Sequence, residues 1–232
     1  MLRNRLFRNG SSEPPGFAAR NVPAEPTPTR LEYAGDVFDC RVVDSSDGGW
    51  TLAYGRRTDG TESRVFRFSD GRLVDSQSVS RPIAGAIATD GVAALVTADG
   101  PETLGGTLEV FGDDGMGFER TFESNLGRPA ITDAGDRVAI STRPPESTVL
   151  LFDPRMGTCL GSCSVRNRTV RVLGFHGDDN GMYLYAGVRN GDEPYLAMNL
   201  DGEVVWGSDR YRATRSLTER VAGVMDRFRG TV

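Results

Sequence analysis

A chain of 232 residues with 38% hydrophobic and 25% charged residues has the composition of an ordinary globular protein that can bury a core. Its formal net charge of −5 disfavours a general nucleic-acid binder, and all of its basic residues are arginine. Because no run reaches the roughly 18 apolar residues of a membrane helix and the start lacks a secretory signal, we expect a cytoplasmic protein without membrane contact.

The first region, residues 1–34, is predicted to be a flexible arm rich in arginine and proline. Proline removes a backbone donor and blocks both helices and interior strands. The prolines of this region are Pro14, Pro15, Pro23, Pro26 and Pro28.

Residues 35–213 carry a repeated pattern in which a glycine-containing turn precedes an apolar strand. The four turns are 47–49, 90–91, 133–137 and 179–181, and the strands that follow them start at Trp50, Val92, Val138 and Met182. These starts are 42, 46 and 44 residues apart. A period near 44 residues predicts a repeat architecture.

Each repeat contains four short apolar segments joined by turns, which predicts one four-stranded antiparallel sheet per repeat. The predicted fold is therefore all-β and β-propeller-like, with four blades at about 36–80, 81–126, 127–167 and 168–213. The units resemble WD-like or quinoprotein-like propeller repeats, since the segment from Gly202 to Trp206 resembles the Gly-x-x-x-Trp end of a quinoprotein-type repeat. The resemblance implies the fold and no particular activity.

Four blades are few for a ring, so three arrangements remain open. The sheets could form a small closed ring, an open arc capped by the termini, or two arcs joined in a homodimer of eight blades. We expect a single closed domain, since an open arc leaves sheet faces and edges uncovered.

The last region, residues 214–232, changes to a helical period. Its apolar residues are Leu217, Val221, Val224, Met225 and Phe228, and Ser216 with Glu219 forms a capping box. We expect a short amphipathic helix docked on the sheets.

The sequence offers no catalytic set, metal site or cofactor motif. His176 is the only histidine, and we expect it in a turn, bonded to a nearby aspartate. Cys159 and Cys163 are expected on one face of a strand, roughly 13 Å apart, which is too far for one disulfide or metal. The Asp- and Gly-rich clusters lack calcium-loop spacing and are typical of turns. We therefore predict a protein that is not an enzyme.

Arginines recur in the loops on one side of the predicted blades, and aspartates recur in the turns on the other side. The arginines are Arg57, Arg81, Arg128, Arg143, Arg168 and Arg189. Because guanidinium groups bind carboxylates and phosphates in bidentate fashion, we predict a binding or scaffold module that presents these residues to an anionic protein or ligand. The alternatives are a structural subunit of a larger complex, or a channel-centred metal-dependent hydrolase or quinone enzyme.

Overall fold

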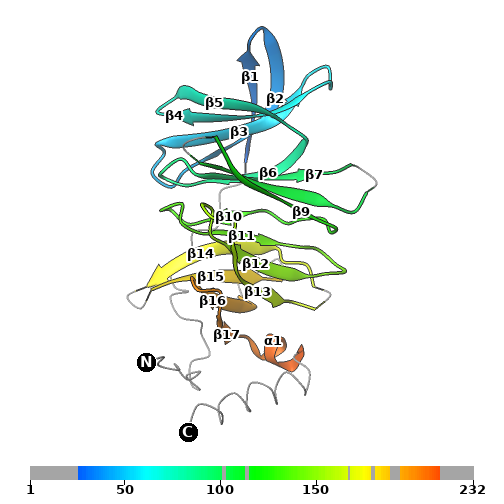
Figure 1. Cartoon of the computed structure of the whole chain (residues 1–232), viewed down its shortest axis with the longest axis vertical. Helices are drawn as coiled ribbons and strands as arrows, with labels where there is room; N and C mark the ends of the chain where they lie inside the picture. The colour runs from blue at the N-terminus through cyan, green and yellow to red at the C-terminus, as the bar shows by residue number, and fades with distance from the viewer. Residues whose placement is uncertain are drawn as a thin grey trace.

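The computed structural model describes residues 26–100, 103–112, 115–166, 168–178, 181–188 and 194–214. The described residues form four antiparallel sheets, and within each sheet every strand pairs with its neighbour in sequence. Figure 1 shows the sheets stacked in chain order, with the first at one end and the fourth at the other. The fold is thus all-β and propeller-like, as the repeat pattern predicts.

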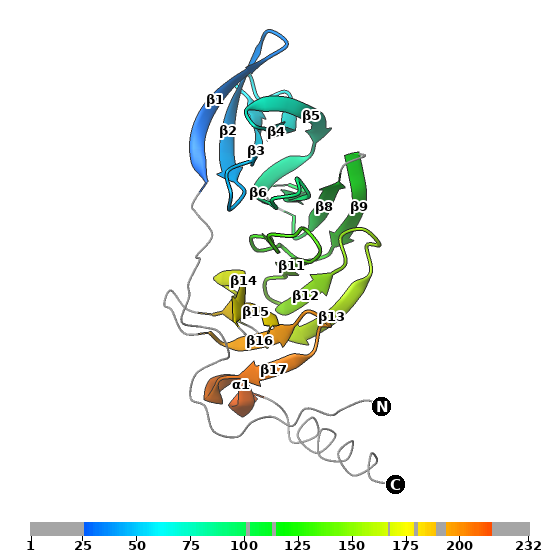
Figure 2. The same cartoon turned by 90° about the vertical axis from the view of Figure 1, so that its left-hand side faces the viewer.

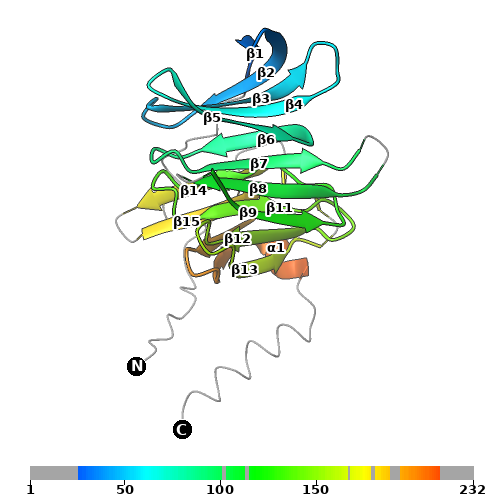
Figure 3. The same ribbon diagram turned by 45° about the horizontal axis from the view of Figure 1, so that its top comes forward.

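The second sheet has the four predicted strands, whereas the first has a fifth strand, β1, which precedes the predicted start of its repeat. The first contains β1 (Thr27–Tyr33), β2 (Asp36–Asp44), β3 (Trp50–Arg57), β4 (Ser63–Ser69) and β5 (Arg72–Val79). The second contains β6 (Arg81–Ile87), β7 (Ala93–Ala98), β8 (Gly106–Gly112) and β9 (Gly115–Phe122), which lie side by side in this order in Figure 3.

The third sheet has strands of two to six residues, and the fourth has two strands of seven residues and two of four. The third contains β10 (Ala130–Ile131), β11 (Val138–Ser141), β12 (Thr148–Phe152) and β13 (Cys159–Ser164). The fourth contains β14 (Val172–Asp178), β15 (Gly181–Gly187), β16 (Leu196–Asn199) and β17 (Val204–Gly207), and helix α1 (Asp209–Thr214) follows it.

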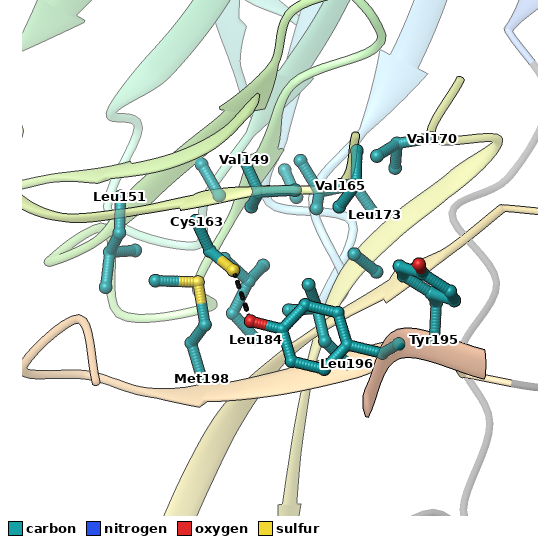
Figure 4. Close-up of a cluster of buried hydrophobic side chains, with 14 residues drawn as sticks. Val149, Leu151, Cys163, Val165, Val170, Leu173, Leu184, Tyr195, Leu196 and Met198 are labelled. Atoms are coloured by element: carbon teal, nitrogen blue, oxygen red, sulfur yellow. Dashed lines mark hydrogen bonds between the residues drawn. The ribbon is translucent and has the colours of Figure 1, made fainter. Parts of the chain in front are cut away.

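Three apolar cores hold the stack together, one between each pair of neighbouring sheets. Since successive side chains of a strand point to opposite faces, each inner sheet contributes to two cores. The core between the first two sheets includes Leu52, Tyr54, Val65, Ile87, Leu95 and Phe111. The next includes Val96, Leu108, Val110, Val138, Ile140 and Phe152. The last includes Val149, Leu151, Val165, Leu173, Leu184 and Met198, which are all labelled in Figure 4.

The first sheet also covers its own outer face, the face turned away from the second sheet. Phe38 and Phe66 are buried there, and the Tyr33 ring on β1 lies 5.3 Å from the Phe66 ring on β4. Such contact between strands that are not neighbours requires the sheet to curl. Gly55 permits the curl, because a Cβ at this position would come within 2.6 Å of the Cys40 Cα on β2.

The sheets form an open row, so the expectation of a closed domain is wrong. Figure 2 shows the first sheet and the fourth sheet at opposite ends of the row. Closure would require the outer face of the first sheet to pack on the fourth. That face is already occupied by the cluster of Phe38, Cys40, Ala53 and Phe66.

The predicted arm of residues 1–34 is wrong at its C-terminal part, because β1 pairs with β2 along its whole length. Pro28 lies within β1, and the strand tolerates it because β1 is an edge strand, where a missing N–H does not break an interior ladder. Residues 1–25 lie outside the described part of the chain.

The helical region begins earlier than the sequence predicts, since α1 starts at Asp209. Tyr211 of α1 reaches into the core between the third and fourth sheets, where its Oη lies 3.0 Å from the Cys163 Sγ and shares a hydrogen bond with it, drawn as a dashed line in Figure 4. The predicted helix from Ser216 to Phe228 lies outside the described residues.

The expectation that Cys159 and Cys163 share one face of a strand is also wrong. A β-bulge opposite Leu151 and Phe152 adds one residue to β13 and reverses the alternation. Cys159 therefore packs towards the second sheet and Cys163 towards the fourth. Neither of these cysteines forms a disulfide, and nor does Cys40.

Candidate functional site

The glycine-containing turns of neighbouring repeats touch one another and define one side of the stack, which we call the turn side. The backbone N–H and the hydroxyl of Thr89, in the β6–β7 turn, both donate to the carbonyl oxygen of Asp133 in the β10–β11 turn, at 3.0 and 2.7 Å. Arg137 Nε in turn donates to the carbonyl of Leu200, next to the β16–β17 turn, at 3.1 Å. These contacts place the turns of three successive sheets side by side.

The aspartates of the turn side hold their own turns together. Asp47 Oδ1 accepts hydrogen bonds from the Ser45 hydroxyl at 2.6 Å and the Gly49 N–H at 3.0 Å, and these bonds lower the pKa of Asp47. Asp153 Oδ1 likewise accepts from two backbone N–H groups of the β12–β13 turn. Within the described ranges, no group of three or more His, Cys, Asp and Glu residues is arranged to hold a metal ion.

The opposite side of the stack contains the predicted arginines, and we call it the arginine side. The strands β2, β6, β10 and β14 each run from this side to the turn side, so the starts of these strands and the interblade loops gather here. Three of the predicted arginines are exposed on this side. Arg81 begins β6, Arg128 precedes β10 and Arg143 follows β11. Arg189 lies outside the described residues. The topology therefore places the described predicted arginines on one side.

Two of the predicted arginines are already engaged by groups of this chain. Arg57 forms ion pairs with Asp36 and Asp59, at 3.2 and 2.6 Å. Arg168 is half-buried, and its guanidinium lies 5.5 Å from the centre of the Tyr195 ring in a cation–π contact. These two residues contribute more to local structure than to an accessible charge.

Acidic residues neutralise the arginine side at the first sheet. Asp59 is held ionised, because hydrogen bonds from Thr61 and from Arg57 lower its pKa to about 2. Glu62 accepts hydrogen bonds from Ser78 and Arg64, which also lower its pKa. The positive charge of Arg57 and Arg64 is thereby balanced locally.

The positive charge concentrates instead between the second, third and fourth sheets. The described parts of loops 123–129, 142–147 and 165–171 contain five arginines and two carboxylates: Arg128, Arg143, Arg166, Arg168 and Arg171, against Glu123 and Glu146. Arg166 and Arg171 were not among the predicted site residues. The signal that could have found them is their sequence position, since they flank Arg168 in one interblade loop.

The histidine and the cysteines do not form a catalytic group within the described residues. His176 lies in β14 and not in a turn as expected, and the centres of the His176 and Tyr185 rings are 5.5 Å apart.

Burial raises the pKa of the Cys40 thiol to about 11, and the charge of Asp39 adds to this effect. Cys40 also lines an open depression of about 360 Å³ with Pro28, Thr29, Arg30 and Asp39. A thiol with so high a pKa is protonated at neutral pH and is a poor nucleophile there.

None of the described helices is long and apolar enough to span a bilayer.

No family model and no curated protein matches this chain. Among solved structures, the chain is similar to hydrazine synthase of Kuenenia stuttgartiensis, with 12% sequence identity and a TM-score of 0.45. The match covers 71% of this chain and 64% of that one.

Proposed function

We propose that this protein is a non-enzymatic binding module that recognises an acidic protein surface through the arginine side of its second to fourth sheets. The observation that carries the proposal is the excess of exposed arginines over carboxylates in the three neighbouring loops of that side, which is four against two: Arg128, Arg143, Arg166 and Arg171 against Glu123 and Glu146. The excess stands out in a chain whose net charge is −5. Arginine suits this role, because its planar guanidinium binds a carboxylate through two parallel hydrogen bonds.

Arg143 and Arg171 are the best candidates for direct contact with a partner. Both are exposed, and in the part of the chain that the structure describes neither side chain has a carboxylate partner. Their binding groups are therefore available without first breaking an internal ion pair. Acidic residues on the turn side, by contrast, would repel the same partner and favour one orientation.

The test uses a fluorescent poly-glutamate peptide as the acidic probe and measures fluorescence anisotropy at low ionic strength. The double variant Arg143→Ser/Arg171→Ser should bind the probe roughly tenfold more weakly, since each exposed ion pair contributes up to about 1 kcal/mol. Raising the salt concentration should reduce the difference in probe affinity between the double variant and the unmodified protein, because screening weakens exposed ion pairs.

The matched control is the double variant Arg72→Ser/Arg155→Ser on the turn side. Arg72 and Arg155 are also exposed, and this control likewise removes two positive charges. The control should bind the probe like the unmodified protein. Equal weakening in both double variants would mean that only net charge matters, and the proposed face would have to be abandoned.

A further inference from the structure

The strand β1 is an addition to the repeat, since no other described sheet has a fifth strand. It forms an edge of the first sheet and contacts mainly its neighbour β2. The Tyr33 ring at its end also packs against the Phe66 ring and lies 5.3 Å from the Arg64 guanidinium. Separation of β1 from the sheet would therefore leave the three cores between sheets intact, because β1 contributes to none of them.

The turn between β1 and β2 is strained at its first residue. It consists of Ala34 and Gly35, whose φ angles are +53° and +87°. Two-residue turns of this kind favour Asn or Asp before Gly, because these side chains tolerate the left-handed conformation. The β4–β5 turn follows this rule, with Asp70 and Gly71 at +48° and +74°. Alanine has no polar side chain to stabilise such a conformation, so the β1–β2 turn stores strain that opening would release.

The register of β1 with β2 suits an exchange of strands between two copies of the chain. The pairing is continuous from Thr27↔Val42 to Tyr33↔Asp36, without a bulge. If the turn straightened, β1 and β2 would form one long strand, and two such strands would pair antiparallel in this same register. Ala34 of one copy would then lie opposite Gly35 of the other, so the ladder would include the turn residues as well.

The turn is also accessible to a second copy. Figures 1 and 2 show the β1–β2 hairpin projecting past the other strands at this end of the stack. A Cβ built at Gly35 would meet no atom within 4 Å, so the space around the turn is open. A second copy therefore reaches this end without displacing a described element.

We propose that two copies of this chain form a dimer by exchanging β1, so that β1 of each copy pairs with β2 of the other. The exchange preserves the contacts of β1, including the ion pair of 3.2 Å between Arg30 and Asp39, and makes them between chains. It also removes the left-handed conformation from both copies of Ala34, and strained short hinge turns of this kind favour such exchange. The dimer joins two open rows of four sheets through their first sheets.

The first test changes the strain in the turn. Ala34→Gly removes the strain from the closed turn and should weaken the dimer. Because each dimer opens two turns, we expect its Kd to rise on the order of tenfold. Sedimentation velocity over a concentration series measures this Kd, after refolding at high protein concentration so that β1 can change partners. The matched control, Asp70→Gly, makes the same kind of change in the β4–β5 turn and should leave the Kd unchanged.

The second test removes the turn. Deletion of residues 34–35 joins Tyr33 directly to Asp36 and preserves the alternation of side chains, because two residues are one period of a strand. The chain cannot then fold back on itself, so the deleted protein should be dimeric at every concentration. A monomeric deletion variant would overturn the proposal. It would also be overturned by equal Kd values for Ala34→Gly and the unmodified protein, or by an unmodified protein that stays monomeric at millimolar concentration.

A cross-link identifies the exchanged strand directly. The double variant Arg30→Cys/Asp39→Cys places two thiols at directly opposed positions of β1 and β2. The background carries alanine in place of Cys40, Cys159 and Cys163, and dibromobimane joins thiols that lie close together. In the exchanged dimer the link should join two chains, which denaturing electrophoresis detects. A dimer in sedimentation whose links all lie within single chains would overturn the proposal, since another surface would then hold the copies together.

Discussion

Glu109 is a carboxyl group buried between the first and second sheets. The residue is 6% exposed, and its Oε1 accepts a hydrogen bond of 3.1 Å from the Thr97 hydroxyl. Burial raises its pKa above the ordinary glutamate value, the Thr97 bond opposes this shift, and the charge of Glu119 adds to it. In the pH range between the ordinary and the raised pKa, the folded protein therefore binds more protons than the unfolded chain, and its stability falls as pH rises.

We predict that Glu109→Gln raises the free energy of unfolding at neutral pH. Glutamine keeps the bond from Thr97 and removes the buried charge. Each pKa unit by which the folded-state value exceeds the unfolded-state value changes the free energy of unfolding by about 1.4 kcal/mol. Urea unfolding at several pH values should show the gain at pH 7 and its disappearance below the ordinary pKa of glutamate.

The control is Glu146→Gln, a change in an exposed loop, which should leave stability nearly unchanged at every pH. A gain from Glu109→Gln that does not vary with pH would show that the carboxylate charge is not its source.

At the scale of elements, the curled first sheet depends on Gly55 of β3. A side chain there would clash with the backbone of Asp39 and Cys40 on β2, and a backbone cannot move aside as a flexible side chain can. We predict that Gly55→Ala lowers the free energy of unfolding by about 3 kcal/mol, at the upper end of the range for inserted methyl groups.

Thermal unfolding measures this effect, with Gly112→Ala as the control. Gly112 ends β8, and a Cβ there meets no other atom within 4 Å. Equal melting temperatures for the two variants would mean that β2 can move away from β3, and the curl would then not depend on Gly55.

At the scale of the whole molecule, Arg67 fastens the first sheet to the second. Its side chain is 3% exposed, with Nη2 donating to Asp75 Oδ2 and Nη1 to the carbonyl of Gly91, each at 3.2 Å. Asp75 belongs to the same sheet, whereas Gly91 belongs to the β6–β7 turn of the next one. The ion pair thus orients a guanidinium that joins two sheets.

We predict that Asp75→Asn destabilises the protein by about 3 kcal/mol, because it leaves a buried positive charge without its counter-ion. Arg67→Met should cost less, since it replaces the charge with an apolar side chain of similar length. Urea unfolding of the two single variants and the double variant gives the coupling energy. Additive effects would show that Arg67 and Asp75 do not act as a pair.

The sequence by itself determined the local order of this protein. Glycine-containing turns before apolar strands, as at Trp50 and Val92, fix antiparallel sheets of about 44 residues, because turn chemistry and alternation act between neighbours in sequence. Antiparallel connectivity then places Arg81, Arg128 and Arg143 on the same side, so this part of the candidate site could also be predicted.

Only the tertiary structure decided features that depend on contacts between distant residues. The β-bulge that separates Cys159 from Cys163, the engagement of Arg57 by Asp36, and the open row of sheets all belong to this class. The curl at Gly55 covers the outer face of the first sheet, which a closed ring would need for packing on the fourth sheet. Strand periodicity carries no information about such close packing. The physical reason is that the pattern along a strand specifies which face is apolar, whereas the shape of the packed sheets specifies what covers it.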